Sequence, residues 1–164
     1  MKKLWEKYRE IIVYIIVGLM TTVVAYGVRF AVLYPFSALL SIDLSADHGS
    51  ATALRTVAIT VGWVAGVIFA FFTNKKWVFR DTVSGKTAVG VQFGKFVASR
   101  VGTFFVEWGL GALVPMLLIA CGYKPFHFIV TVDADLVSTA ISVVLVTVLN
   151  YILSKLLVFK KKDK

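Results

Sequence analysis

The sequence is poor in charge, and the charge that it carries is mostly of one sign. Only 16% of its 164 residues are Asp, Glu, Lys or Arg, whereas 59% are hydrophobic; soluble domains carry roughly 25% charged and about 45–50% apolar residues. A chain of this composition cannot cover itself with a solvated surface, which excludes a water-soluble globule. Its 18 Lys and Arg against 9 Asp and Glu give a net charge of +9, but without a solvated basic face we expect no nucleic-acid partner.

Cysteine and histidine are also scarce. The single cysteine, Cys121, excludes an intramolecular disulfide, and only two histidines, His48 and His127, are present. These residues cannot form a zinc site of the usual kind. They also have no orienting partner that would make a Ser–His–Asp or Cys–His catalytic set. We therefore expect no metal, no cofactor, no catalytic residues and no enzymatic activity.

What the sequence has in abundance is long apolar segments. A helix that crosses a membrane needs roughly 20 mostly apolar residues, and four segments qualify: 11–33, 54–73, 96–121 and 136–159. The connections between them are short and contain no linker or low-complexity tract. The sequence therefore predicts an all-α integral membrane protein, with four transmembrane helices in a single domain over residues 1–164.

The basic residues are gathered at the two termini and in the central connection. Fifteen of the 18 Lys and Arg lie in residues 2–9, 75–100 and 155–164, whereas the other two connections contain aspartates and a single cation, Lys124. Basic residues are retained on the cytoplasmic side of a membrane. Both termini should thus face the cytoplasm, in a multi-pass protein of the cytoplasmic (inner) membrane. The same basic ends should attract anionic lipids.

The second and fourth apolar segments resemble each other at an offset of 80 residues. Residues 74–79, NKKWVF, correspond to residues 154–159, SKLLVF, and the helices before them carry small or polar residues at every fourth position, such as Gly62 and its counterpart Ser142. Positions four apart share one helix face, where small residues let two helices approach closely. We predict two helical hairpins in the same orientation, a parallel repeat about the membrane normal. Similar packing needs of two hairpins would also explain the small residues.

Three sequence elements together resemble a known family. They are the NKKWVF element of residues 74–79, the pattern Lys95-Phe96-x-x-x-Arg100-x-Gly102 at the start of the third segment, and Asn150, Lys155 and Phe159 at the end of the fourth. In these elements the chain is similar to the GtrA-like family over residues 5–160. The resemblance implies a role in cell-surface polysaccharide synthesis, where sugars travel on polyprenyl-phosphate lipids. It implies either flipping of the lipid-linked sugar or support of the membrane glycosyltransferase that makes it.

Polar residues at the cytoplasmic ends of the predicted helices are the candidates for binding a lipid phosphate. We predict that this site consists of Asn74, Lys75, Arg100 and Lys155. Guanidinium and ammonium groups are strong donors to phosphate oxygens. The alternative for the two lysines is that they only extend to the lipid headgroups. The hydrophobic members of the motif are expected to pack around the site: Trp77, Val78, Phe79, Phe96 and Phe159.

A second set of residues lies deeper in the predicted bundle. Ala70, Glu107 and Asn150, with the small-residue faces, would line a crevice for the sugar. A carboxylate inside a membrane is a functional candidate by default, although Glu107 could instead be paired inside the bundle or at an oligomer contact. Arg29, expected near the outer boundary, could receive a phosphate there, but pairing with a loop aspartate is the favoured alternative.

Two functions of different class follow from these residues. The preferred one is translocation of a polyprenyl-phosphate-linked sugar for cell-surface polysaccharide or teichoic-acid glycosylation. The alternative is a non-catalytic subunit that anchors or stabilises a polyprenyl-phosphate glycosyltransferase, which is in either case an expected partner. A small multidrug transporter fits less well, because its carboxylate belongs to the first helix and Glu107 lies in the third segment. Four helices enclose little space, which favours a homo-oligomer.

Overall fold

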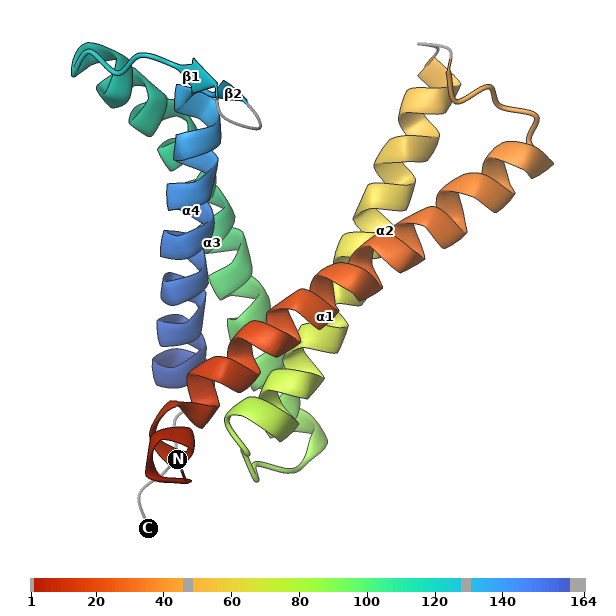
Figure 1. Ribbon diagram of the computed structural model, residues 1–164. Coiled ribbons are helices and arrows are strands. Elements are labelled where there is room, and N and C mark those ends of the chain that lie inside the picture. The colour runs from red at the N-terminus through yellow and green to blue at the C-terminus, as the bar shows by residue number, and fades with distance from the viewer. Residues whose placement is uncertain (1, 46–48, 128–130, 160–164) are drawn as a thin grey trace. The chain divides into compact units, whose positions relative to one another are not determined.

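Four long helices dominate the structure. The computed structural model describes residues 2–45, 49–127 and 131–159. They form α1 (Lys2–Leu39), α2 (Gly49–Thr73), α3 (Lys86–Ala120) and α4 (Ala134–Leu153), and two π-helical turns follow α2 and α4: η1 (Asn74–Val78) and η2 (Ser154–Val158) (Figure 1). Between α3 and α4, the strands β1 (Phe126–His127) and β2 (Thr131–Val132) pair in antiparallel fashion. The C-terminal lysines at 160–162 and 164, and Asp47, lie outside the described residues.

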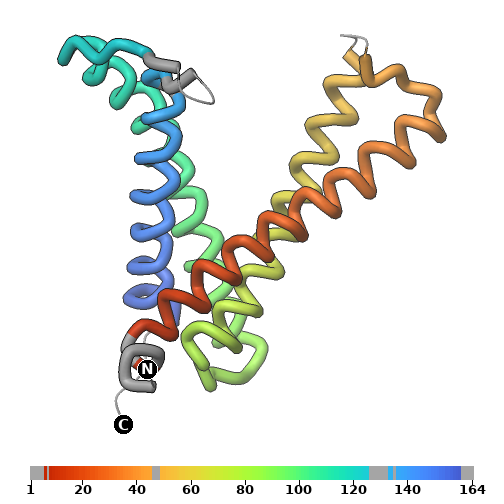
Figure 2. Tube along the Cα trace, in the orientation of Figure 1, coloured from red at the N-terminus to blue at the C-terminus, as the bar shows by residue number. Residues whose placement is uncertain are grey.

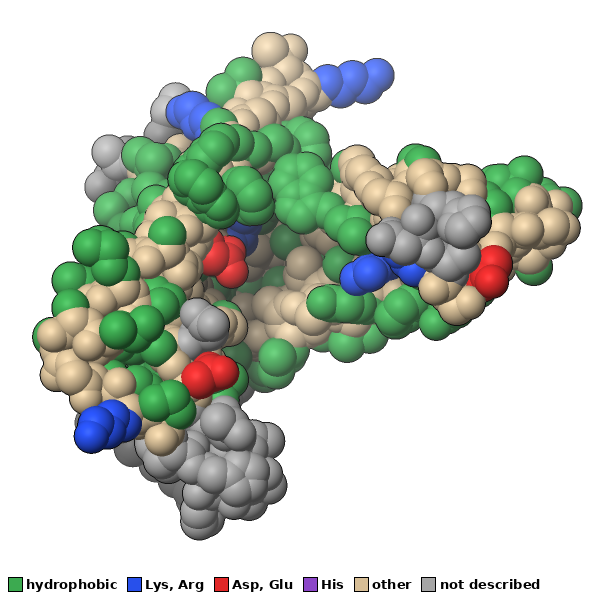
Figure 3. Space-filling model, turned by 90° about the horizontal axis from the view of Figure 1, so that it is seen from above, with side chains coloured by type: hydrophobic (Ala, Val, Ile, Leu, Met, Phe, Trp, Pro, Cys, Tyr) green, Lys and Arg blue, Asp and Glu red, His purple; other side chains and the backbone are tan. Residues whose placement is uncertain are grey.

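The helices contain four segments that are long and apolar enough to cross a membrane: Tyr8–Leu39, Gly49–Val78, Lys86–Ala120 and Leu136–Val158. The predicted all-helical membrane architecture is confirmed. Large hydrophobic side chains are exposed along all four helices, and Figure 3 shows hydrophobic side chains spread over the visible face of each hairpin. The helices extend beyond the predicted segments, since α1 runs from Lys2 to Leu39 and α3 begins at Lys86. An apolar run marks only the part of a helix inside hydrocarbon, and flanking polar residues continue the same backbone hydrogen bonds.

The chain divides into two compact units, Met1–Thr82 and Val83–Lys164. Each unit is a helical hairpin, in which α1 packs along α2 or α3 packs along α4 (Figure 2). The boundary falls in the central connection, so that each unit contains one copy of the sequence repeat.

The two hairpins end in the same way. In each, the second helix passes into a π-helical turn, and the turn is followed by a buried phenylalanine whose amide donates to the first carbonyl of the turn, Phe79 to Asn74 at 2.9 Å and Phe159 to Ser154 at 2.8 Å. The ring of Phe79 packs on Tyr14 with ring centroids 6.5 Å apart, and the ring of Phe159 packs on Phe96 at 6.3 Å. The sequence repeat is thus also a repeat of local structure.

A side chain from the first helix of each hairpin binds a carbonyl of the π-helical turn. Arg9 donates to the carbonyl of Trp77 at 3.0 Å, and Gln92 donates to the carbonyl of Val158 at 3.3 Å. The end of a helix leaves backbone carbonyls without an intrahelical partner. These two side chains supply that partner and tie the end of each hairpin together.

Glycines set the closest approach of α1 and α2. A Cβ atom added at Gly62 would lie 2.5 Å from the carbonyl oxygen of Ala25 and 3.0 Å from Cβ of Arg29, and one at Gly66 would lie 3.1 Å from Cβ of Ala25. No real Cβ approaches a backbone oxygen as closely as the first distance, so the two backbones touch at Gly62. The small-residue face of α2 therefore packs against α1.

We expect Gly62→Ala to destabilise the first hairpin, because the added methyl group must push α1 away from α2. The matched control is Gly18→Ala, since no atom of the described residues lies within 4 Å of a Cβ added at Gly18 and alanine favours a helix more than glycine does. The free energy of unfolding should fall by about 1–3 kcal/mol for Gly62→Ala and should not fall for Gly18→Ala. Equal thermal transitions of the two variants in the same detergent would contradict this packing.

Candidate functional site

The predicted phosphate-binding residues belong to the ends of both hairpins. Asn74 and Lys75 begin η1, Arg100 lies in α3, and Lys155 is the second residue of η2. The first hairpin therefore supplies an amide and a lysine, and the second supplies a guanidinium and a lysine. Each pair is described below with the residues of its own hairpin.

Lys75 forms an ion pair in the first hairpin. Its Nζ lies 2.8 Å from Oδ2 of Asp81, and the two side chains are only 13% and 10% exposed. The amide of Asp81 also donates to the carbonyl of Lys75 at 2.8 Å, after a positive φ of 49° at Arg80. The chain thus folds back and presents a carboxylate to Lys75. Sequence reasoning passed over Asp81, although an acidic residue six positions beyond a lysine, at a helix end, is a usable signal.

Asn74, the residue before Lys75, is buried. The residue is 2% exposed, and its Oδ1 is buried without a hydrogen-bond partner among the described residues. Ser154 holds the same position in the second hairpin, with a buried Oγ that also has no partner there. Ala70, one helical turn before Asn74, is buried as well. Unpartnered buried polar atoms are costly, and π-helical turns are frequent at functional sites.

Asn150 is part of a hydrogen-bonded group between α3 and α4. Its Oδ1 accepts a hydrogen bond from Oγ1 of Thr103 at 2.9 Å, and both side chains are buried. The same hydroxyl lies 3.1 Å from the carbonyl of Arg100, whose guanidinium stacks over the ring of Phe96 at 4.7 Å. The hydroxyl of Thr103 thus lies between the side chain of Asn150 and the main-chain carbonyl of Arg100. Sequence reasoning missed Thr103, although a threonine three residues after Arg100 lies on the same helix face.

The other predicted residues of η1 and η2 lie partly at the surface. Lys155 is exposed, and its Nζ donates to the hydroxyl of Tyr151 at 3.0 Å and lies 5.3 Å from the centre of that ring. Trp77 is exposed, whereas Val78 and Phe79 are buried. The hydrophobic motif residues therefore close the hairpin ends, with the tryptophan left on the outside.

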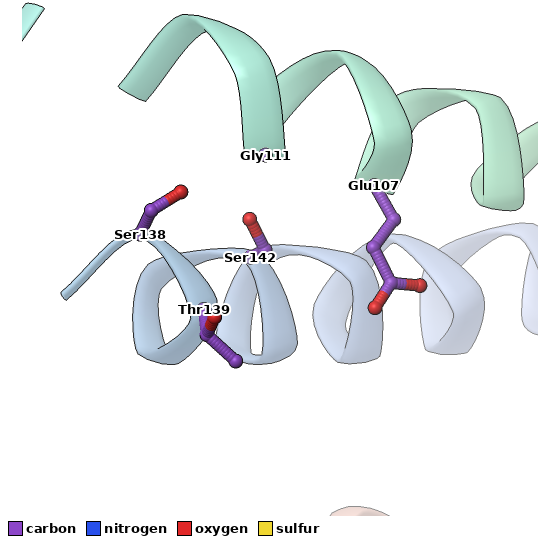
Figure 4. Close-up of a pocket in the computed structure, with 5 residues that line it drawn as sticks. All are labelled: Glu107, Gly111, Ser138, Thr139 and Ser142. Atoms are coloured by element: carbon purple, nitrogen blue, oxygen red, sulfur yellow. The ribbon is translucent and has the colours of Figure 1, made fainter. Parts of the chain in front are cut away.

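A polar pocket of about 240 Å³ lies between α3 and α4. Its lining residues are Glu107, Gly111, Ser138, Thr139 and Ser142 (Figure 4). In Figure 4, Ser138 and Ser142 point toward α3 and the carboxylate of Glu107 extends toward α4. Ser138 donates to the carbonyl of Leu110 at 3.4 Å, whereas Oγ of Ser142 is buried and has no partner within the described ranges. The face of α4 that matches the glycines of α2 thus opens onto a hollow.

The pocket and the cations of each hairpin offer two different kinds of binding chemistry. The carboxylate and hydroxyls of the pocket accept and donate hydrogen bonds, and the cations at the hairpin ends bind anionic oxygens. Within the described ranges, no three His, Cys, Asp or Glu side chains gather as ligands for a metal ion.

Comparison with known proteins places these features in a family. The sequence model of the family described as GtrA/DPMS, transmembrane domain, matches residues 13–159. The chain is 34% identical over 106 residues to the cell wall teichoic acid glycosylation protein GtcA of Listeria monocytogenes serovar 1/2a, a match over 65% of this chain and 64% of that protein. It is 32% identical over 105 residues to the protein of the same name from Listeria innocua serovar 6a, over 63% of each chain.

The match thus spans less than two thirds of the length of these two relatives. A longer match joins the chain to the uncharacterized membrane protein YwcD of Bacillus subtilis, at 28% identity over 148 residues, or 90% of this chain and 94% of that one. No solved structure matches the chain significantly. Because the family match covers residues 13–159, well over half of the chain, the chain belongs to the GtrA/DPMS transmembrane-domain family.

Proposed function

We propose that this protein moves a polyprenyl-phosphate-linked sugar across the cytoplasmic membrane for the glycosylation of a cell-surface polymer such as teichoic acid. The observation that carries the proposal is the similarity to two Listeria proteins that are named for cell wall teichoic acid glycosylation. A sugar attached outside the cell must first cross the membrane. It cannot do so unaided, because polar groups without partners in hydrocarbon cost several kcal/mol each. The protein's part in this step is non-catalytic.

In this proposal, both termini and the hairpin ends that contain η1 and η2 face the cytoplasm. The lipid would bind first at these hairpin ends. This orientation rests on the basic residues at these ends, since such residues are retained in the cytoplasm. Lys75 already holds a carboxylate of Asp81 at 2.8 Å in a nearly buried site, which supports its ability to hold an anionic oxygen. In the proposed complex a phosphate oxygen replaces that carboxylate, and a donor group of the ligand reaches Oδ1 of Asn74.

In the second hairpin, Arg100 and Lys155 would likewise bind a lipid phosphate. The guanidinium is a planar fork that can hold two phosphate oxygens at once. Its stacking on Phe96 fixes the plane of that fork before any ligand arrives, so less conformational entropy is lost on binding. The exposed Lys155 adds a mobile positive charge nearby on η2.

The pocket beside Glu107 supplies the deeper part of the path. A volume of about 240 Å³ equals roughly eight water molecules at about 30 Å³ each, which suits a single sugar ring and is small for a longer chain. Its carboxylate and serine hydroxyls would replace the water around the sugar hydroxyls, while the isoprenoid tail stays in the bilayer. Asn150 would line the way toward this pocket in the second hairpin, and Ala70 would line the lipid's path in the first.

We expect Arg100→Ala to slow transport of the lipid-linked sugar by at least about tenfold, because a charge-assisted hydrogen bond contributes about 1.5–3 kcal/mol. The assay uses liposomes that contain the purified protein and a labelled polyprenyl-phosphate sugar, and it measures the label that becomes accessible on the far side. The matched control is Lys95→Ala, an exposed cation five residues earlier on α3. Equal transport by the two variants would count against the assigned phosphate site.

The proposed orientation places Cys121 outside the cell and the central connection inside. Cys121 is the only cysteine and is exposed at the end of α3, so a membrane-impermeant maleimide should label it in intact cells. In the double variant Cys121→Ser, Ser84→Cys, the exposed cysteine at 84 should react only after the cells are opened. The reverse labelling pattern would overturn the orientation.

A further inference from the structure

Arg29 packs against the middle of α2 and not against its end. Its Cβ is one of the atoms nearest to Gly62, and Gly62 is close to the middle of the span Gly49–Val78. The α1 span, Tyr8–Leu39, continues ten residues beyond Arg29. Its 32 residues measure about 48 Å at 1.5 Å per residue. That length exceeds a hydrocarbon thickness of roughly 30 Å, and a tilted helix would hold both Arg29 and residues beyond it within the apolar layer.

The guanidinium of Arg29 has aromatic neighbours and, among the described residues, no anion. Its carbon lies 5.7 Å from the ring centre of Tyr26 and 5.8 Å from that of Phe30. Its Nε is buried without a hydrogen-bond partner, and in the part of the chain that the structure describes no carboxylate pairs with it. The pairing with a loop aspartate that was favoured from the sequence is therefore not seen there. A cation inside a membrane is costly and usually marks the path of a charged ligand.

Three aromatic side chains form a ladder on the same part of α1. Tyr26 and Phe30 have ring centres 6.1 Å apart, and Phe30 and Tyr34 are stacked at 5.7 Å. The rings contact one another because positions four apart lie on one helix face. All three side chains are about half exposed. A tyrosine combines an apolar ring face with a polar hydroxyl, and the apolar faces of sugar rings stack well on such rings.

We propose that Arg29, with Tyr26, Phe30 and Tyr34, forms a second site for the phosphate of a glycosylated isoprenoid lipid, distinct from the site at the hairpin end. Arg29 binds the phosphate oxygens, and the aromatic ladder holds the sugar. Gly62, which packs against Arg29, and Lys75 are 13 residues apart on α2 and η1, or about 20 Å along the helix axis. Between the two sites the lipid phosphate therefore moves from the end of the span Gly49–Val78 to its middle.

This inference rests on the proposed function, but its chemistry is more general. A phosphate diester occurs both in a polyprenyl-phosphate sugar and in an ordinary phospholipid such as phosphatidylglycerol. The half-exposed ring faces beside the guanidinium favour the sugar-bearing lipid, because the acyclic headgroup of phosphatidylglycerol gains little from stacking on them. Arg29 is only partly buried, which leaves the side chain within reach of a lipid that lies against the hairpin.

The test measures lipid retention and transport with the same full-length protein. Native mass spectrometry of protein released from phosphatidylglycerol nanodiscs, doped with polyprenyl-phosphate glucose or with polyprenyl phosphate, reports which lipid stays bound. We expect Arg29→Gln to reduce retention of the glucosylated lipid by about tenfold. The control Arg55→Gln removes the same charge from a guanidinium that already donates to the carbonyl of Leu44, and it should retain the lipid as the wild type does. Melting temperatures show whether both variants are folded.

The outcomes separate this inference from the proposed function. If the wild type transports the lipid in liposomes and Arg29→Gln binds and transports it equally well, the Arg29 site is wrong and the function stands. If Arg29→Gln loses the lipid but the wild type moves none, the site stands and transport is wrong. Retention of phosphatidylglycerol that equals that of the glucosylated lipid, and falls with Arg29→Gln, would overturn the assignment to a sugar-bearing lipid.

Discussion

Polar groups inside hydrocarbon must find partners within the protein, and each hairpin is organised by this constraint. Helical backbone hydrogen bonds meet most of the demand. Thr21, Thr22 and Thr73 donate to carbonyls one turn earlier on their own helices, and Arg9 and Gln92 cover carbonyls of the π-helical turns. The exceptions are therefore informative. In the described residues, the buried side-chain atoms without a partner belong to Arg29, Asn74, Ser142 and Ser154, and three of these four belong to the sites argued above for a ligand.

The two hairpins are alike where they close and different where they would carry a ligand. Both end in a π-helical turn, a buried phenylalanine and an aromatic contact to the preceding helix. Further along, Gly62 lies in backbone contact with α1, whereas its counterpart Ser142 faces a pocket that contains Glu107. One copy of the repeat thus uses the small-residue face for packing, and the other leaves it open. A duplicated scaffold can diverge in this way without loss of the closing contacts.

The sequence predicts the parts of the structure that depend on one helix at a time. Runs of apolar residues locate the four spans, and the offset of 80 residues locates the repeated ends, because length and hydropathy act locally. The ion pair of Lys75 with Asp81 and the bond of Thr103 to Asn150 depend on how a chain end folds back or how two helices meet. The depth of Arg29 depends on the tilt of a helix that is longer than a membrane is thick. Spacing along the chain marks Asp81 and Thr103 as candidates, but it does not give the partner that each one meets.

Under the proposed function, the protein acts after the lipid-linked sugar has been made. The most direct test is to quantify that lipid in the membranes of cells that lack the protein but keep the glycosyltransferase. The account predicts that the glycosylated polyprenyl phosphate persists or accumulates on the cytoplasmic face, while the surface polymer loses its sugar. Absence of the lipid itself from these cells would contradict the account and assign the protein to the synthesis step as a subunit of the transferase.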